Sequence, residues 1–324
     1  DKKLYKPLAP LSALLALAFL ISGLAILVLD LGRPDRLIVA MTTYNFKSIF
    51  AWNIFLYSGF AGILAIYIWT MLDRNVKKFS RPAGVFAFTW RIVLTTGTGS
   101  IFGFLISREA YGTAILAPLF IIMSLLYGTV VYFLIVKTIN YFQKTLFSEE
   151  ILQNLRKLTL VFLFANLYFL ILYHVTNLYI SKHLDFEKFI LLDGGVYTIA
   201  FWVGQVVIGL LLPLFILFRD ENKSESSLMS ATLLILVGSF LAMYVIIIAG
   251  QAYPLKIFSN YEILESSFYD NVIHTYIPTI WELGLGLGGI ALSLIIVLIG
   301  IANLDFLPTI IKSPEAKKVA ESDS

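Results

Sequence analysis

Eight long apolar segments, separated by short polar connections, occupy most of this 324-residue chain. They fall at roughly residues 8–29, 48–72, 83–107, 113–140, 155–181, 190–218, 226–252 and 276–303. Each reaches the ~20 residues that a helix needs to cross the hydrocarbon core of a bilayer. With a mean hydropathy of +0.85 and 14% charged residues, the chain is too apolar for a water-soluble fold. The sequence therefore predicts an all-α, polytopic membrane protein.

The connection at 141–154 contains several consecutive polar residues and divides the eight segments four and four. Short connections make sequential helices antiparallel neighbours. We therefore expect two antiparallel four-helix bundles, at 1–140 and 155–304, with 141–154 as the connection and 305–324 as a tail.

Basic residues are distributed unequally between the two sides of such a protein. Sixteen lie on the side of both chain ends, namely Lys2, Lys3, Lys6, Arg74, Lys77, Lys78, Arg81, Lys137, Lys144, Arg156, Lys157, Arg219, Lys223, Lys312, Lys317 and Lys318. Seven lie on the opposite side, namely Arg33, Arg36, Lys47, Arg108, Lys182, Lys188 and Lys256. The positive-inside rule predicts cytoplasmic N- and C-terminal ends for this chain, with 141–154 and 305–324 on the same side of the cell membrane. The net charge of +3 follows from this topology and gives no reason to expect nucleic-acid binding.

The chain has no cysteine and three histidines. Iron–sulfur clusters held by Cys thiolates are therefore excluded for this subunit, and the usual bis-His haem needs two histidines on facing helices. Only His174 lies well inside a predicted span. We therefore expect no haem, no Fe–S cluster and no metal site in this chain.

Polar side chains within a membrane span face a bundle interior or a cavity and are functional candidates. The segment 155–181 carries Asn166, Tyr173, His174 and Asn177 near one helical face, with His174 about two turns from one end. An imidazole at this depth can exchange a proton and bind a carbonyl group. The alternative is a structural histidine that bonds to the backbone of a neighbouring helix.

Two carboxylates lie near the outer ends of other spans. Asp30 precedes Arg33 and Pro34, so it either pairs with Arg33 or simply marks the helix end. Glu282 lies about one turn inside the last span, where a carboxylate pairs with a cation or takes up a proton. Gly284 and Gly288 form the small-xxx-small pattern that lets membrane helices approach closely.

Arg91 lies about three turns inside the third span, with Thr95 and Thr98 on the same face. Its guanidinium cannot lose its proton, so it needs water, carbonyl groups or a carboxylate. Arg91, Thr95 and Thr98 are candidates for a cytoplasmic proton path. The alternative is that Arg91 extends to the membrane interface.

Several of these motifs resemble the polysulfide-reductase membrane subunit family of the NrfD/PsrC type. The most specific is LDLGRP at 29–34, followed by SIFAW at 48–52. The resemblance continues through GFLIS at 103–107, IAGQAYP at 248–254 and YIPTIWE at 276–282, and covers essentially the whole chain. Relatives usually carry one more helix before the span that ends in LDLGRP, and many have a Tyr where this chain has Ile101.

The resemblance implies a quinone-interacting membrane anchor of a respiratory oxidoreductase, which is not catalytic alone. Relatives dock an outer ferredoxin-like Fe–S subunit, often with a molybdopterin catalytic subunit that reduces sulfur, polysulfide or a similar acceptor. Menaquinol or a related quinol would bind near the outer face and pass electrons to the partner, and the reverse direction is equally compatible with the sequence. The candidate quinone-binding residues are Tyr173, His174, Asn177, Arg33, Arg108 and Gln251; the candidate catalytic residues are His174, Asp30 and Glu282.

Two other classes fit eight helices. A secondary transporter commonly shows repeats and helices broken near the midplane. Here Pro118 and Pro213 lie towards span ends, which disfavours that class. An anchor that binds no quinone is the other alternative, and quinol-dependent reduction of the partner's clusters would separate it from the first interpretation.

Overall fold

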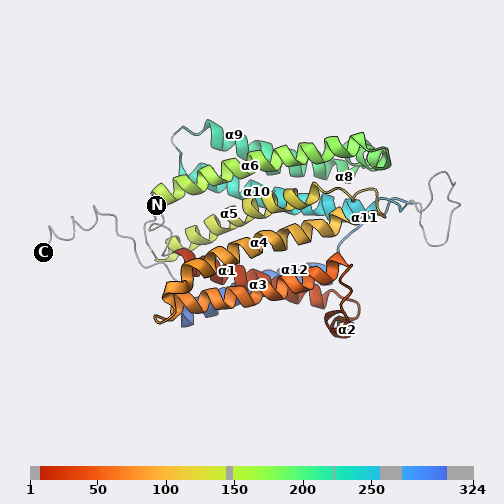
Figure 1. Ribbon diagram of the computed structural model, residues 1–324. Coiled ribbons are helices and arrows are strands. Elements are labelled where there is room, and N and C mark those ends of the chain that lie inside the picture. The colour runs from red at the N-terminus through yellow and green to blue at the C-terminus, as the bar shows by residue number, and fades with distance from the viewer. Residues whose placement is uncertain (1–7, 144–148, 222, 256–271, 305–324) are drawn as a thin grey trace. The chain divides into compact units, whose positions relative to one another are not determined.

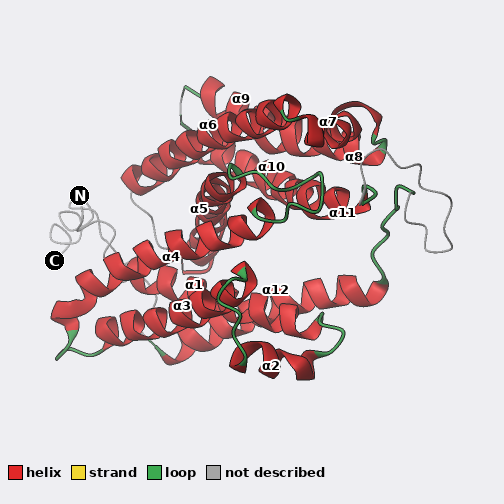
Figure 2. Ribbon diagram, turned by 45° about the vertical axis from the view of Figure 1, so that its right-hand side comes forward, coloured by secondary structure: helices red, strands yellow, loops and turns green. Residues whose placement is uncertain are grey.

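The computed structural model of the chain describes residues 8–143, 149–221, 223–255 and 272–304 (Figure 1). All regular structure within these ranges is helical, with loops and turns between the helices (Figure 2). The predicted tail at 305–324 and part of the connection at 141–154 lie outside the described residues. The predicted all-α class is confirmed.

Eight helical stretches are long and apolar enough to cross a membrane. Five are single α-helices or nearly so: α1 (Ala9–Leu29), α3 (Ile49–Leu72), α4 (Ser80–Gly103), α5 (Leu116–Gln143) and α6 (Glu149–Tyr179). Two are interrupted by π-helical turns, namely α8 (Val196–Ile199) with η6 (Ala200–Leu211) and α9 (Leu212–Arg219), and α10 (Glu225–Tyr244) with η7 (Val245–Ala249) and α11 (Gly250–Ala252). The eighth is α12 (Ile280–Asn303). The spans lie where the sequence predicted them, and the chain is a multi-pass membrane protein.

Short helices occupy the connections. They are η2 (Pro34–Arg36), α2 (Leu37–Thr42), η3 (Lys77–Phe79), η4 (Ser181–His183), α7 (Leu184–Lys188) and the π-helical η5 (Phe189–Asp193). The helix α1 ends at Leu29 and the next helix begins at Pro34, whose missing N–H and fixed φ suit the first position of a helix.

The chain divides into two compact units. Unit 1 is Asp1–Gly97 with Ile277–Ser324, and unit 2 is Thr98–Tyr276, so the boundary falls inside α4. The expected division into bundles at 1–140 and 155–304 is not confirmed, because α12 packs against α1 in unit 1. Connection length favours sequential neighbours, but surface shape decides which apolar helices pack together.

In unit 1, α1 packs against α3 and α12 around a core that includes Leu20, Phe60 and Leu94. Close approach of α12 to α1 depends on Gly289 and Gly300. A Cβ atom on Gly289 would lie 1.8 Å from Cδ1 of Ile26, and one on Gly300 would lie 2.6 Å from Cδ1 of Leu14. The predicted pair at 284 and 288 faces open space within the described residues, so the small-residue contact lies further along the helix.

In unit 2, α10 packs against η6, α9 and α5, and α5 packs against α6. The closest backbone approach joins Gly209 of η6 to Gly238 of α10, where a Cβ atom on Gly238 would lie 2.0 Å from the Gly209 Cα. Any side chain at either position would separate these helices. The glycine pair therefore fixes the crossing of the sixth and seventh spans.

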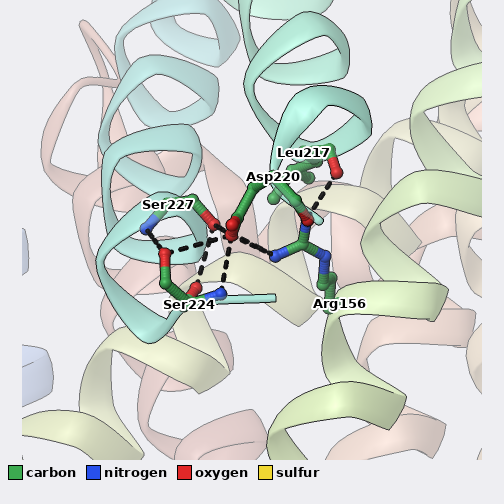
Figure 3. A network of polar contacts seen from close by, with 5 residues as sticks. All are labelled: Arg156, Leu217, Asp220, Ser224 and Ser227. Carbon is green, nitrogen blue, oxygen red and sulfur yellow. Dashed lines mark hydrogen bonds and ion pairs between the residues drawn. The ribbon is translucent and has the colours of Figure 1, made fainter. Parts of the chain in front are cut away.

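One end of unit 2 is closed by a polar network around Arg156, whose side chain is 7% exposed (Figure 3). Its Nη1 donates to Asp220 Oδ2 at 2.9 Å and to Ser227 Oγ at 3.0 Å, and its Nη2 donates to the carbonyls of Leu217 and Asp220. Ser224 caps α10 and also donates through its backbone N–H to Asp220 Oδ2 at 2.6 Å. The guanidinium thus joins α6 to the end of α9 and the start of α10.

Candidate functional site

The opposite end of unit 2 contains the polar stripe that the sequence singled out. After α6 ends at Tyr179, the chain turns through η4 and folds back as α7, which packs against α6. The short helix α7 is amphipathic: Phe186 and Glu187 are buried, whereas Lys188 is exposed. This fold-back carries Glu187 to His174, thirteen residues earlier in the chain.

His174 and Glu187 form a buried acid–base pair. The distance from His174 Nδ1 to Glu187 Oε2 is 2.7 Å, and the two side chains are 13% and 0% exposed. A carboxylate removed from water needs hydrogen-bond donors to offset its desolvation. Asn177 supplies a second one, because its Nδ2 donates to Glu187 Oε1 at 2.8 Å.

A further layer fixes the orientation of Asn177. Thr113 Oγ1 donates to Asn177 Oδ1 at 2.8 Å, which leaves the amide nitrogen of Asn177 for Glu187. Tyr173 donates to the Ala110 carbonyl at 2.8 Å and so ties α6 to the same loop. We refer to Thr113, Tyr173, His174, Asn177 and Glu187 as the His174 cluster.

The pairing determines which nitrogen of His174 is available. An ionised carboxylate only accepts hydrogen bonds, so Nδ1 carries a proton and the neutral ring has its lone pair on Nε2. No hydrogen-bond partner for Nε2 is recorded among the described residues. The ring packs edge-on against Phe201 at a centroid distance of 4.7 Å. His174 is thus an oriented proton acceptor in apolar surroundings.

His174 lies at the edge of the buried face of α6. Tyr173 and Asn177 are buried, whereas Ile171 and Val175 are 55% and 57% exposed. In a membrane protein such exposed apolar side chains face lipid. A lipid-soluble molecule can therefore approach the imidazole from the side of the helix.

The loop between α4 and α5 is attached to η7 and α11. Tyr111 donates to the carbonyl of Ile246 at 2.8 Å, and Arg108 Nη1 donates to the backbone carbonyl of Gln251 at 3.0 Å. Burial raises the pKa of Tyr111 to about 12, although Arg108 partly opposes this shift. The phenol therefore remains a hydrogen-bond donor at physiological pH.

A cavity of about 380 Å³ lies at the other end of unit 2, away from the His174 cluster. Its lining includes Lys137, Glu149, Lys223 and Glu225, and Lys137 pairs with Glu225. Quinone rings and other apolar ligands occupy mostly apolar pockets. We therefore do not assign this charged cavity to a quinone.

The sequence matches the family described as "Polysulphide reductase, NrfD" over residues 1–254. The chain belongs to this family. Three of its relatives are membrane subunits of oxidoreductases from diverse organisms. The "Hdr-like menaquinol oxidoreductase integral membrane subunit" of Archaeoglobus fulgidus is 26% identical over 94% of this chain and 78% of its own length.

Two further relatives are more distant. The C subunit of the selenate reductase of Mesobacillus selenatarsenatis is 21% identical over 91% of this chain and 77% of its own length. The "Putative dimethyl sulfoxide reductase membrane subunit", designated C, of Halobacterium salinarum is 23% identical over 96% of this chain and 77% of its own length. The family resemblance expected from LDLGRP and the other motifs is confirmed.

The structure places the candidate site residues of this NrfD-family chain in both units. Tyr173, His174 and Asn177 come together in unit 2, where Arg108 meets the backbone, and not the side chain, of Gln251. The unit 1 candidates are Asp30, Arg33 and Glu282. No ion pair between Asp30 and Arg33 is recorded among the described residues, and Asp30 is exposed.

Glu282 takes part in a capping box at the start of α12. Its Oε2 accepts from the Thr279 backbone N–H at 2.6 Å, and its own N–H donates to Thr279 Oγ1 at 3.3 Å. The carboxylate therefore satisfies an otherwise unpaired N–H at the helix start.

The candidate proton path lies along α4. Arg91 is exposed, and its guanidinium lies 5.7 Å from the Phe60 ring centroid, within the range of a cation–π contact. Thr95 donates to the Arg91 carbonyl at 2.9 Å and is buried. Thr98 lies across the unit boundary on the same helix. Role assignments for Arg91, Thr95 and Thr98 stay predictions.

Glu187 and Thr113 were missed by reasoning from the sequence, which searched only within spans for buried polar residues. The signal for Glu187 was present, because His183, Glu187 and Ile190 follow helical spacing and all three are buried. Thr113 carries no such pattern. Among the described residues no group of three or more His, Asp or Glu side chains is arranged to hold a metal ion.

Proposed function

We propose that this chain is the quinol-reacting membrane subunit of a respiratory oxidoreductase complex and transfers electrons to an Fe–S partner subunit. Family membership and a relative named for menaquinol oxidation support this proposal. The observation that carries it is the His174–Glu187 pair, which orients a proton acceptor beside a lipid-facing surface. Menaquinol, or a related quinol, is the proposed substrate.

The residues of the His174 cluster fit a quinol hydroxyl. A quinol supplies two electrons and two protons when it is oxidised. His174 Nε2 accepts a hydrogen bond from the hydroxyl and then its proton, and Glu187 stabilises the imidazolium that results. Asn177 holds Glu187 in place. The second nitrogen of the ring is thus kept in the protonation state that the first one needs.

The remaining candidates receive supporting roles. Asp30 and Glu282 would relay protons to the outer side, and the exposure of both is compatible with that role. Arg33, Arg108 and Gln251 would shape the mouth of the site or bind the partner. Arg108 stabilises the loop that carries Thr113, so its effect on the quinol would be indirect.

The orientation of the chain follows from its basic residues. We propose that the His174 cluster lies towards the outer face of the cell membrane and that both ends of the chain are cytoplasmic. A ferredoxin-like Fe–S subunit, together with a molybdopterin catalytic subunit, would then dock on the outer face. Sulfur or polysulfide is one candidate terminal acceptor; relatives named for selenate and dimethyl sulfoxide reduction broaden the class.

The test is His174→Ala in the intact complex. A positioned general base contributes roughly 10²–10⁴-fold to a rate, so quinol-dependent turnover should fall by about that factor. Partner activity with an artificial electron donor should remain. His183→Ala is the matched control, because His183 is also buried but bonds to the backbone carbonyl of Glu109. Quinol turnover near the wild-type value in His174→Ala would make this histidine structural.

A further inference from the structure

A small cavity lies within the helices of unit 2, between the His174 cluster and the Arg156 network. Its volume is about 10 Å³, and it is lined by residues of α5, α6, η6 and α10. The polar side chains at its wall are Tyr127, Asn166, Gln205 and Ser239. Four polar groups around one small space are unusual inside an apolar bundle.

Gln205 has an unsatisfied acceptor at this cavity. The residue is 5% exposed, and its Oε1 has no hydrogen-bond partner among the described residues. A buried amide oxygen without a donor is costly, and water from the bulk phase does not reach it inside a membrane. The oxygen therefore needs a donor from within the cavity.

The neighbouring side chains are already engaged in ways that leave room for a ligand with two donors. Ser239 donates to the Leu236 carbonyl at 2.7 Å, so its oxygen is left as an acceptor. Tyr127 and Asn166 are hydrogen-bonded to each other. A molecule that donates to Gln205 Oε1 and Ser239 Oγ, and accepts from the Tyr127–Asn166 pair, would satisfy all of these groups.

The size of the cavity selects the ligand. A volume of about 10–15 Å³ accommodates one water molecule, and a buried water usually makes about three hydrogen bonds to polar groups. Adjacent contacts keep the cavity from expanding, because Gly209 touches Gly238 and a Cβ atom on Gly204 would lie 2.4 Å from the Leu241 side chain. We propose that a single water molecule is bound here and donates to Gln205 Oε1.

The proposal is independent of quinol chemistry and is tested by hydroxyl-radical footprinting of the intact complex. Radicals generated from a bound water oxidise the side chain beside it, so Tyr127 should be modified although it lies inside the bundle. Gln205→Leu removes the acceptor and fills the space, and it should reduce Tyr127 oxidation to background. Tyr132, on the same helix but outside the cavity wall, is the internal control and should be unchanged.

Equal oxidation of Tyr127 in wild type and Gln205→Leu would overturn the proposal. If Gln205→Leu fails to assemble, Gln205→Met gives the same test with a more flexible side chain. An experimental structure that resolves ordered waters supplies an independent measurement. A solvent peak within hydrogen-bond distance of Gln205 Oε1 would support the bound water, and an empty cavity at that resolution would refute it.

Discussion

The two ends of helix α6 carry buried charged side chains that differ in what they can do. Near its start, Arg156 binds Asp220, two backbone carbonyls and Ser227. Near its end, His174 pairs with Glu187. A guanidinium retains its proton under all physiological conditions, whereas an imidazole gains and loses one near neutral pH. The first network is suited to holding helices together, and the second to proton exchange.

The hydrogen-bond supply of each network supports the same distinction. The Arg156 guanidinium donates from both terminal nitrogens, and Asp220 Oδ2 receives donors from Arg156, Ser224 and Ser227. The His174 ring uses one nitrogen on Glu187, and no partner for the other is recorded among the described residues. Burial of charge on a membrane helix is therefore not by itself evidence of a reactive site; an unused acceptor next to the charge is a better indicator.

The largest expected effect is that of Glu187→Gln on turnover. The amide cannot stabilise an imidazolium as a carboxylate does, so quinol-dependent turnover should fall by about 10²-fold, the lower end of the range for a positioned general base. Activity with an artificial electron donor should be retained. Asp193→Asn, an exposed carboxylate in the same region, should leave both activities unchanged. Equal losses in the two variants would remove the distinction between the ends of α6.

Labelling of single cysteines would show which end of unit 2 faces outwards. Lys188 lies at the end with the His174 cluster and Glu221 at the end with Arg156, and both side chains are exposed. In this cysteine-free chain, Lys188→Cys should react with an impermeant thiol reagent added to intact cells, and Glu221→Cys should react only after permeabilisation. The reverse pattern would place the proposed quinol site on the cytoplasmic side.

Arg156→Met should affect stability and not the chemistry of the site. The substitution leaves the carbonyls of Leu217 and Asp220 without their donor, so the thermal midpoint of the purified complex should fall by several degrees. Quinol turnover per folded complex should stay near wild type. Arg219→Ala is the control, because Arg219 is exposed and stacks on Phe215. A loss of turnover without a loss of stability would assign Arg156 a role in the reaction.

The smallest effect concerns the acid stability of the Arg156 network. Hydrogen bonds from Ser227, followed by those from Arg156 and Ser224, hold the pKa of Asp220 well below its ordinary value of 3.8. A depressed folded-state pKa stabilises the protein above the unfolded value, and this stabilisation is lost as pH falls towards the folded value. The difference in thermal midpoint between wild type and Asp220→Asn should thus be constant from about pH 8 to about pH 5 and should shrink below about pH 4. A constant difference through the acidic range would contradict this assignment.

The sequence by itself determined the eight spans and the membrane class. A membrane span is a local property, because about 20 consecutive apolar residues are sufficient to define it. The end of α1 before Pro34 and the buried positions of Tyr173 and Asn177 could be predicted for the same reason. Family membership also followed from short motifs that lie within single segments.

Only the tertiary structure decided which faces meet. Lipid is as apolar as the helix surfaces, so hydropathy does not specify that α12 packs on α1 through Gly289 and Gly300. Likewise, the fold-back of α7 brings Glu187 to His174, and a separate loop brings Thr113 to Asn177. These contacts depend on the geometry of turns and on close helix packing, which hydropathy patterns do not encode.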